Sequence, residues 1–146
     1  MPVADLRIHR NGLLVEVSLG PSAPLRALLW RQSKPVPPAI FATFLVDTGA
    51  DTTMVSEQLM RSLGLAPTSQ TRVITSTTGA KGETCDVYGV ELTLLPHVAQ
   101  PKRWGAVEVL ARPLLNQGTD GLLGRDLLAQ LVLNYDGPRA VASITY

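Results

Sequence analysis

A carboxylate directly follows an apolar run in the first third of the chain. Residues Ile40 to Val46 are apolar apart from Thr43, and Asp47, Thr48 and Gly49 come immediately after them. The run is long enough for a buried strand, and Gly49 marks the turn that ends it. A carboxyl group there can exchange a proton with water or substrate, but burying its charge is costly. Asp47 is therefore a candidate acid or base, and the alternative is an ordinary turn aspartate.

A second segment favours the catalytic interpretation. Residues 121–126 are Gly-Leu-Leu-Gly-Arg-Asp, in which a charged pair opens a helical pattern. Residues 47–51 are Asp-Thr-Gly-Ala-Asp, and the two segments, in this order and in a chain of this length, resemble the retropepsin family of aspartic proteases in its bacterial and cellular branch. The resemblance covers residues 10–146 and is closest at these two segments.

The resemblance implies a mostly β fold, closed-barrel-like as in the retropepsin (acid protease) fold, with one or two short helices and a long flap hairpin. We expect a single domain over 1–146, with its core at 10–146. The N-terminal arm, 1–9, is expected either at a dimer interface or as a processing remnant. The sequence contains no internal repeat, so this is not a two-lobed enzyme duplicated within one chain.

The implied activity is that of an aspartic endopeptidase. In this family two carboxylates held close together share one proton, so that one can deprotonate water while the other protonates the peptide carbonyl. The chain has one Asp-Thr-Gly, because Asp120-Gly121 and Asp136-Gly137 lack the intervening hydroxyl. The resemblance therefore implies a homodimer in which each subunit contributes Asp47 to a shared site. It implies a peptide or protein substrate and no cofactor or metal.

The resemblance also assigns supporting roles around the catalytic Asp47. Thr48 would bond across the dimer, Gly49 would offer its carbonyl to substrate, and Asp51 would bind substrate backbone and pair with Arg125. If that pair is buried, removing one partner would be costly. Leu122 and Leu123 would pack behind the Asp47 loop. The full set of supporting residues is Thr48, Gly49, Ala50, Asp51, Leu123, Gly124, Arg125 and Asp126.

The flap is expected at the glycine-bearing tip between two β-prone arms, where it would close over substrate and exclude water. One departure from the retroviral pattern is the charge of this tip, at Lys81 and Glu83, which bears on substrate preference. The flap and substrate-binding residues are expected to be Thr77, Thr78, Gly79, Ala80, Lys81 and Gly82.

Composition restricts the class of protein. Of the 146 residues, 45% are apolar and 17% are charged, which fits a compact domain with its own core rather than a disordered chain. The net charge of +1 and the scattered basic residues do not suggest nucleic-acid binding. The lone Cys85 excludes an internal disulfide and fits a reducing compartment. No apolar run is long enough for a membrane span and Met1 to Gly20 lacks a signal-peptide pattern, so we expect a cytoplasmic location.

Alternation and turn residues predict the remaining elements. In the first half we expect a strand over 13–19, which a turn at 11–12 pairs with residues 6–9. An irregular segment follows over 20–38 and is partly extended at 26–30. A helix is expected over 57–63, between Ser56 and Gly64, and a hairpin arm over 71–77. In the second half we expect the other arm over 85–95, a loop over 96–104, a strand over 106–110, turns over 116–120, helical turns over 126–130, and strands over 131–135 and 140–146. By family resemblance, the last strand would join the two subunits.

Several chemically capable side chains have simpler structural interpretations. His9 and His97 lack a partner at a suggestive spacing, and Cys85 opens a strand. Trp30 and Trp104 are expected to pack or to form a rim, while Glu16, Glu91 and Glu108 are expected on solvated faces. Two alternatives to the endopeptidase stay open: a catalytically silent retropepsin-fold module that binds peptide or dimerises, and a structural β-barrel in which Asp47 is a turn residue.

Overall fold

The computed structural model describes residues 1–76, 78–114 and 118–146, and the fold is mostly β. Strands account for 46% of the chain and helices for 14%. Six strands close into a barrel in the order β2 (Leu14–Pro21), β3 (Ile40–Val46), β8 (Gly121–Leu123), β4 (Met54–Ser56), β7 (Lys102–Arg112) and β6 (Glu83–Leu94), with β6 pairing back onto β2. The predicted mostly β, closed-barrel fold is confirmed.

Alternating apolar side chains fill the barrel. Val17 and Leu19 of β2 are fully buried, as are Val90, Leu92 and Leu94 of β6, which pairs antiparallel with β2. Successive side chains of a strand point to opposite faces, so each strand supplies one apolar row to the interior. The predicted alternation over 13–19 is confirmed.

Helix α2 (Glu57–Leu63) covers one side of the barrel and agrees with the predicted helix residue for residue. Met60 and Leu63 are buried. Gly64 has φ of 73°, the left-handed conformation that glycine adopts most easily, and it ends the helix. Ser56 precedes the helix, although its side chain makes no capping hydrogen bond.

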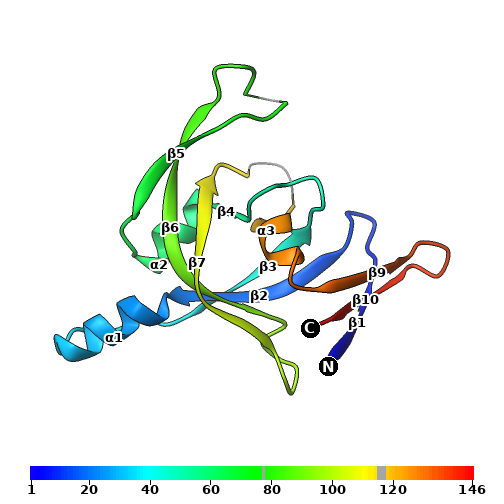
Figure 1. The fold of residues 1–146 in the computed structure, drawn as a ribbon, viewed down its shortest axis with the longest axis horizontal. Coiled ribbons are helices and arrows are strands. Elements are labelled where there is room, and N and C mark those ends of the chain that lie inside the picture. The colour runs from blue at the N-terminus through cyan, green and yellow to red at the C-terminus, as the bar shows by residue number, and fades with distance from the viewer. Residues whose placement is uncertain (77, 115–117) are drawn as a thin grey trace.

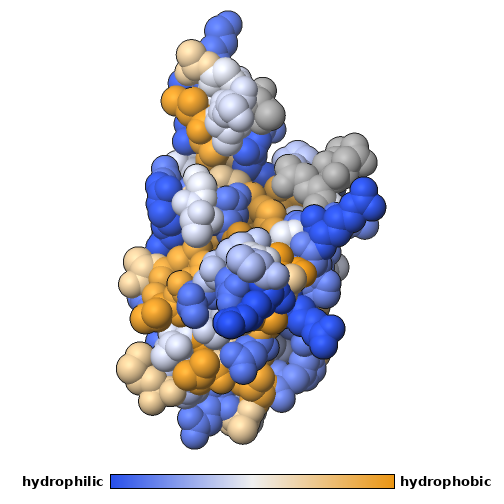
Figure 2. All heavy atoms as spheres, turned by 90° about the vertical axis from the view of Figure 1, so that its right-hand side faces the viewer, coloured by the Kyte–Doolittle hydropathy of each residue, from blue (hydrophilic) through white to orange (hydrophobic). Residues whose placement is uncertain are grey.

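The hairpin in which the flap is expected, called the flap hairpin below, consists of β5 (Ser69–Val73) and the first part of β6. The strands are antiparallel with Val73 opposite Glu83, so the predicted hairpin is confirmed. Within the part of the chain that the structure describes, strand β5 pairs only with β6, and it lies outside the closed ring of six strands. The hairpin rises above the barrel in Figure 1 and forms a narrow projection in the space-filling view of Figure 2.

Both ends of the chain lie in a separate three-stranded sheet, in the order β1 (Val3–Arg7), β10 (Val141–Thr145) and β9 (Val132–Asp136). The two termini are close together beside this sheet in Figure 1. Ile144 of β10 is fully buried and joins the barrel core. The predicted C-terminal strands are confirmed, and within one chain the last strand pairs with β1 and β9. A short helix, α3 (Arg125–Leu128), precedes them where helical turns were predicted.

The prediction of an irregular, partly extended segment over 20–38 was wrong in its first half. Residues Ala23–Arg31 form helix α1, which projects from the barrel in Figure 1. Ser22 caps it by accepting a hydrogen bond from the Leu25 amide at 3.4 Å, and Pro24 lies in the first turn. Proline is compatible with that position because the first amides of a helix have no intrahelical acceptor.

Other expectations need smaller corrections. The turn at Asn11-Gly12 closes only an isolated bridge between His9 and Gly12, and β1 pairs with β10 rather than with β2. Strand β3 is only half buried, with Phe41 largely exposed. Strand β7 starts at Lys102, earlier than expected. The predicted turns at 116–120 lie partly outside the described residues.

Across the part of the chain that the structure describes, the helices are too short or too polar to cross a membrane.

A substitution at Gly121 tests the closest packing in the barrel wall. A Cβ there would lie 2.5 Å from the Phe44 ring and 2.6 Å from the Met54 carbonyl oxygen. Gly121→Ala is therefore expected to lower the free energy of unfolding by about 1–3 kcal/mol, measured by denaturant titration. The matched control is Gly105→Ala, whose Cβ would meet its nearest neighbour at 3.6 Å. Equal stability of the two variants would contradict this packing.

Candidate active site

Asp47 lies where two neighbouring parallel strands end. Strand β3 pairs with β8, with Val46 opposite Leu123, and the Asp47 amide donates to the Leu123 carbonyl at 3.0 Å. The Gly49 amide donates to Asp47 Oδ1 at 2.9 Å. A Cβ on Gly49 would lie 3.1 Å from that same oxygen, so glycine lets the backbone approach the carboxylate closely. The turn thus supplies a backbone donor that orients the Asp47 carboxylate.

Backbone hydrogen bonds join the two segments singled out in the sequence. The Arg125 amide donates to the Ala50 carbonyl at 2.9 Å, and the Asp126 amide donates to the Asp51 carbonyl at 3.2 Å. The Arg125 side chain adds a bond from Nη1 to the Thr48 carbonyl at 3.0 Å. The structure therefore brings residues 47–51 into direct contact with residues 123–126.

Asp51 and Arg125 form the expected ion pair, between Asp51 Oδ1 and Arg125 Nη2. The pair is not buried in the single chain, because the side chains are 83% and 55% exposed respectively. An exposed ion pair contributes little to stability. Its position instead leaves the Asp51 side chain accessible at the cleft.

A buried hydroxyl lies beneath this floor. Thr53 is fully buried, and its Oγ1 donates to Asp126 Oδ1 at 2.8 Å and accepts from the Gly124 amide at 3.1 Å. The Thr53 amide also donates to both oxygens of Asp126, at 3.0 and 3.1 Å. Gly124 has no room for a Cβ, which would lie 2.6 Å from the Thr52 carbonyl carbon. This network fixes the chain after Asp47 against the start of α3.

Asp47 opens onto a cleft of about 890 Å³ between the barrel and the flap hairpin. The floor is formed by Asp47, Gly49, Ala50, Asp51 and Thr52, together with Leu122. One wall comes from β7, and the facing wall comes from β5 and the residues that follow it, as far as Ser76.

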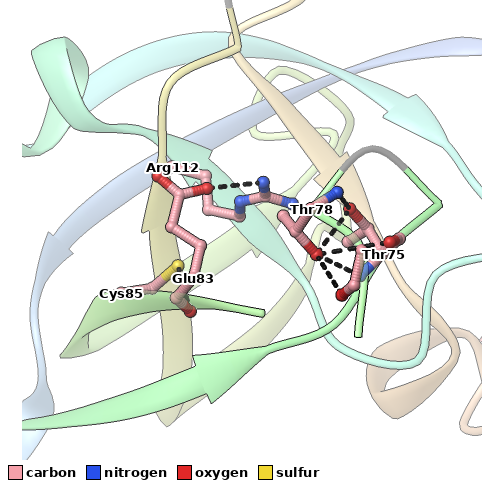
Figure 3. Close-up of polar contacts among 6 residues, drawn as sticks. Thr75, Thr78, Glu83, Cys85 and Arg112 are labelled. Atoms are coloured by element: carbon pink, nitrogen blue, oxygen red, sulfur yellow. Dashed lines mark hydrogen bonds and ion pairs between the residues drawn. The ribbon is translucent and has the colours of Figure 1, made fainter. Parts of the chain in front are cut away.

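The described part of the flap tip is a pair of tight turns. The Thr78 amide donates to the Thr75 carbonyl at 3.2 Å, the Thr75 amide donates to Thr78 Oγ1 at 2.8 Å, and Figure 3 shows the resulting cluster. Gly79 and Gly82 have φ of 69° and 67°, and the Gly82 amide donates to the Gly79 carbonyl. Ala80 and Lys81 are exposed at the end. Thr77, expected in the flap, lies outside the described residues.

Cys85, at the flap base, is buried. Burial raises the pKa of the Cys85 thiol, an effect that the nearby Arg112 partly opposes. A raised pKa keeps the thiol protonated at neutral pH, which agrees with a structural side chain. Trp104 is also buried, with Nε1 donating to Gln130 at 2.9 Å. Trp30 is 80% exposed on α1.

Within residues 1–76, 78–114 and 118–146, no three His, Cys, Asp or Glu side chains lie close enough together to hold a metal ion.

Comparison with known proteins agrees with this geometry. The model of a family described as aspartyl protease matches residues 40–127, from β3 into α3. This match covers more than half of the chain, and the chain belongs to the aspartyl protease family. No curated protein sequence matches it at a significant level.

Among solved structures, the chain is similar to a retropepsin-like aspartic protease from Rickettsia conorii, with a TM-score of 0.63 and 14% sequence identity. The match covers 99% of this chain and 91% of that one. At this identity the likeness establishes the retropepsin-like fold.

Sequence reasoning missed two parts of the site. Thr53 was not given a role, although it lies two residues before the buried Val55, and this alternation places its side chain inside the barrel. Arg72 and Arg112 were not singled out at all, and Glu108 was expected only on a solvated face, yet all three line the cleft. Their strands meet only in the folded barrel, so no local motif connects them.

The buried hydroxyl gives a stability test. Thr53→Val keeps the shape but leaves the Gly124 amide and the Asp126 carboxylate short of a partner, so we expect a loss of about 1–3 kcal/mol in the free energy of unfolding. Thr52→Val, next to it on the more accessible side of the chain, is the matched control and is expected to cost much less. A Thr53 variant as stable as this control would show that the buried network does not hold the floor.

Proposed function

We propose that this protein is a homodimeric aspartic endopeptidase that hydrolyses peptide bonds with water activated by two Asp47 carboxylates, one from each subunit. The observation that carries the proposal is the position of Asp47. The carboxylate lies on the floor of an open cleft and is oriented by the Gly49 amide, in a chain of the aspartyl protease family.

The chemistry requires two carboxylates. When two such groups are held close together, repulsion prevents both from ionising, so the pair retains one proton. The ionised member accepts a proton from water, and the protonated member donates to the carbonyl oxygen of the scissile bond. The two groups titrate as a unit, so the pH dependence of activity belongs to the pair.

The second carboxylate is proposed to come from a second copy of the chain. Asp51, the nearest aspartate in sequence, is paired with Arg125, and the chain has a single Asp-Thr-Gly. Thr48 and Gly49 are exposed in the single chain, which is the condition required for a two-fold contact at the floor. In the dimer Thr48 would bond across the axis, and the sheet that contains the arm 1–9 would lie near the subunit boundary.

Substrate would bind as an extended strand beneath the flap. Gly49 and Asp51 would bind its backbone, Ala50 would contact it on the floor, and the tip 77–82 would close over it. Leu123, Gly124, Arg125 and Asp126 would hold the floor in place. Backbone hydrogen bonds in such a complex supply affinity, while pockets for alternate side chains supply specificity.

Replacing the proposed catalytic carboxyl tests the activity. Asp47→Asn preserves the size of the side chain but removes both the base and the acid, so we expect kcat/KM to fall by a factor of about 10² to 10⁴ or more. The measurement is cleavage of a mixed peptide library, followed by mass spectrometry, from acid to neutral pH.

Glu57→Gln on α2 is the control, because it also removes one carboxylate and Glu57 is not among the residues that line the cleft. Equal cleavage by wild type and Asp47→Asn would refute the proposal. Binding of peptides without cleavage by the wild type would instead identify the alternative, a catalytically silent peptide-binding module.

Mixing the two proteins tests whether the site is shared. A heterodimer would have one Asp47 and one Asn, and it would be inactive. Equal amounts of wild type and Asp47→Asn, allowed to exchange subunits, should therefore leave about half of the activity per wild-type chain. A larger excess of the variant should lower it further.

Sedimentation velocity at several concentrations accompanies this measurement. The proposal requires a dimer at the concentrations at which cleavage is seen. Activity that is unaffected by the variant, in a protein that sediments as a monomer, would show that one chain is sufficient.

A further inference from the structure

The side chains that line the cleft from β7 change from acidic to apolar to basic along the strand. Glu108, Leu110 and Arg112 alternate along the strand, and all three line the cleft. Residues at every second position of a strand share a face, so the wall offers an acidic, an apolar and a basic side chain in sequence. Arg112, the last of these, lies at the end of β7 nearest the flap base.

Arg112 is buried to an unusual degree for a cleft arginine. Its side chain is only 14% exposed, and Nη2 donates to Glu83 Oε2 at 3.0 Å. Nε is fully buried and has no hydrogen-bond partner among the described residues. Figure 3 shows the side chain extending from the end of β7 toward the Thr75–Thr78 turn of the flap.

Glu83 does not satisfy this guanidinium. It contacts one nitrogen through one oxygen, and its side chain is 47% exposed. A guanidinium is a planar fork that binds a carboxylate best through two parallel hydrogen bonds. An unpaired donor on a buried arginine is costly, so the site has unused capacity for an anionic oxygen.

A second cation faces the same space. Arg72, on β5, lines the cleft from the flap side, and among the described residues it makes no ion pair. Its backbone lies opposite Thr84, directly beside Glu83. The flap end of the cleft thus carries two arginines close to the half-exposed carboxylate of Glu83.

We propose that Arg112, assisted by Arg72, forms a subsite that binds an acidic side chain of the peptide substrate. This inference rests on the proposed function and specifies its substrate class. The substrate carboxylate would bind the terminal nitrogens of Arg112, since Nε is buried, and Glu83, half exposed, can turn toward water when it enters. The acidic residue would lie toward the flap base, and the substrate position facing Leu110 would be apolar.

The rest of the cleft favours a single carboxylate over a polyanion such as a nucleic acid. Asp47, Asp51 and Glu108 line the same cavity, and they would repel a chain of phosphates. A peptide with one acidic side chain avoids these groups while it reaches the arginines.

Paired peptides provide the test. In a cleavable peptide taken from the library, Glu and Gln are exchanged at one position at a time. For wild type, we expect kcat/KM to be at least about 10-fold higher with Glu than with Gln at one position, and near equality at the others.

Arg112→Gln should bring that ratio close to one. Arg112→Lys keeps the charge without the fork and should give an intermediate ratio. Arg72→Gln should lower the ratio in part. The control is Arg103→Gln, an exposed arginine on the same strand that does not line the cleft, and it should leave the ratio unchanged.

Two further measurements keep the outcome clear. The double variant Arg112→Gln/Glu83→Gln removes both charges, so that no carboxylate is left beside a missing partner if the single variant folds poorly. Binding of the Glu and Gln peptides to Asp47→Asn, measured by fluorescence anisotropy, detects the subsite without catalysis and so separates its failure from failure of the proposed function.

Loss of discrimination in the Arg112 variants, in cleavage or in binding, supports the subsite. A wild type that does not distinguish Glu from Gln at any position overturns it, as does a preference that persists unchanged in both Arg112→Gln and the double variant.

Discussion

The buried hydroxyl of Thr53 is the contact on which the floor of the cleft depends. It joins the Gly124 amide to the Asp126 carboxylate, and so links the chain that follows Asp47 to the chain that follows β8. The parallel pairing of β3 with β8 fixes the position of the two segments along the strand direction. The Thr53 hydroxyl fixes the distance between them. Because the Thr53 hydroxyl and the Gly124 amide are buried, each needs its protein partner, and the floor has one favourable arrangement. The exposed Asp51–Arg125 pair, in contrast, is not needed to hold the floor, because the Thr53 network already fixes the backbone on which the pair lies.

The floor and the flap differ in how they are held. The floor belongs to a ring of six strands with a filled interior, whereas β5 pairs on one side only and presents mostly exposed side chains. Few buried contacts and a single row of hydrogen bonds allow local opening at a low cost in free energy. The proposed function needs a rigid carboxylate and a cover that admits substrate, and the fold would provide these two properties in separate elements.

Much of this arrangement follows from local sequence patterns. Three elements were predicted correctly: the strand before Asp47, the strand over 13–19 and the helix between Ser56 and Gly64. In each of them the spacing of the apolar residues agrees with the residues that begin or end the element. Helix α1 was missed because five prolines from Gly20 to Pro38 indicate an irregular segment, although Pro24 lies in the first turn of a helix, where proline is tolerated. The pairing of β1 with β10 was not predictable from the Asn11-Gly12 turn, since it joins the two ends of the chain. The arginines of the cleft were missed for the same reason: β5 and the end of β7 approach one another only in three dimensions.

The terminal sheet has a practical consequence for engineering. Strands β1 and β10 run antiparallel with Val3 opposite Thr145, so the two ends of the polypeptide emerge side by side. A short glycine-serine bridge can therefore connect them without disturbing the barrel, and new ends can be opened at an exposed loop elsewhere. A circular permutant of this kind would keep the β1–β10–β9 sheet within one covalent unit and would free other positions on the surface for attachment of a tag or a fused partner.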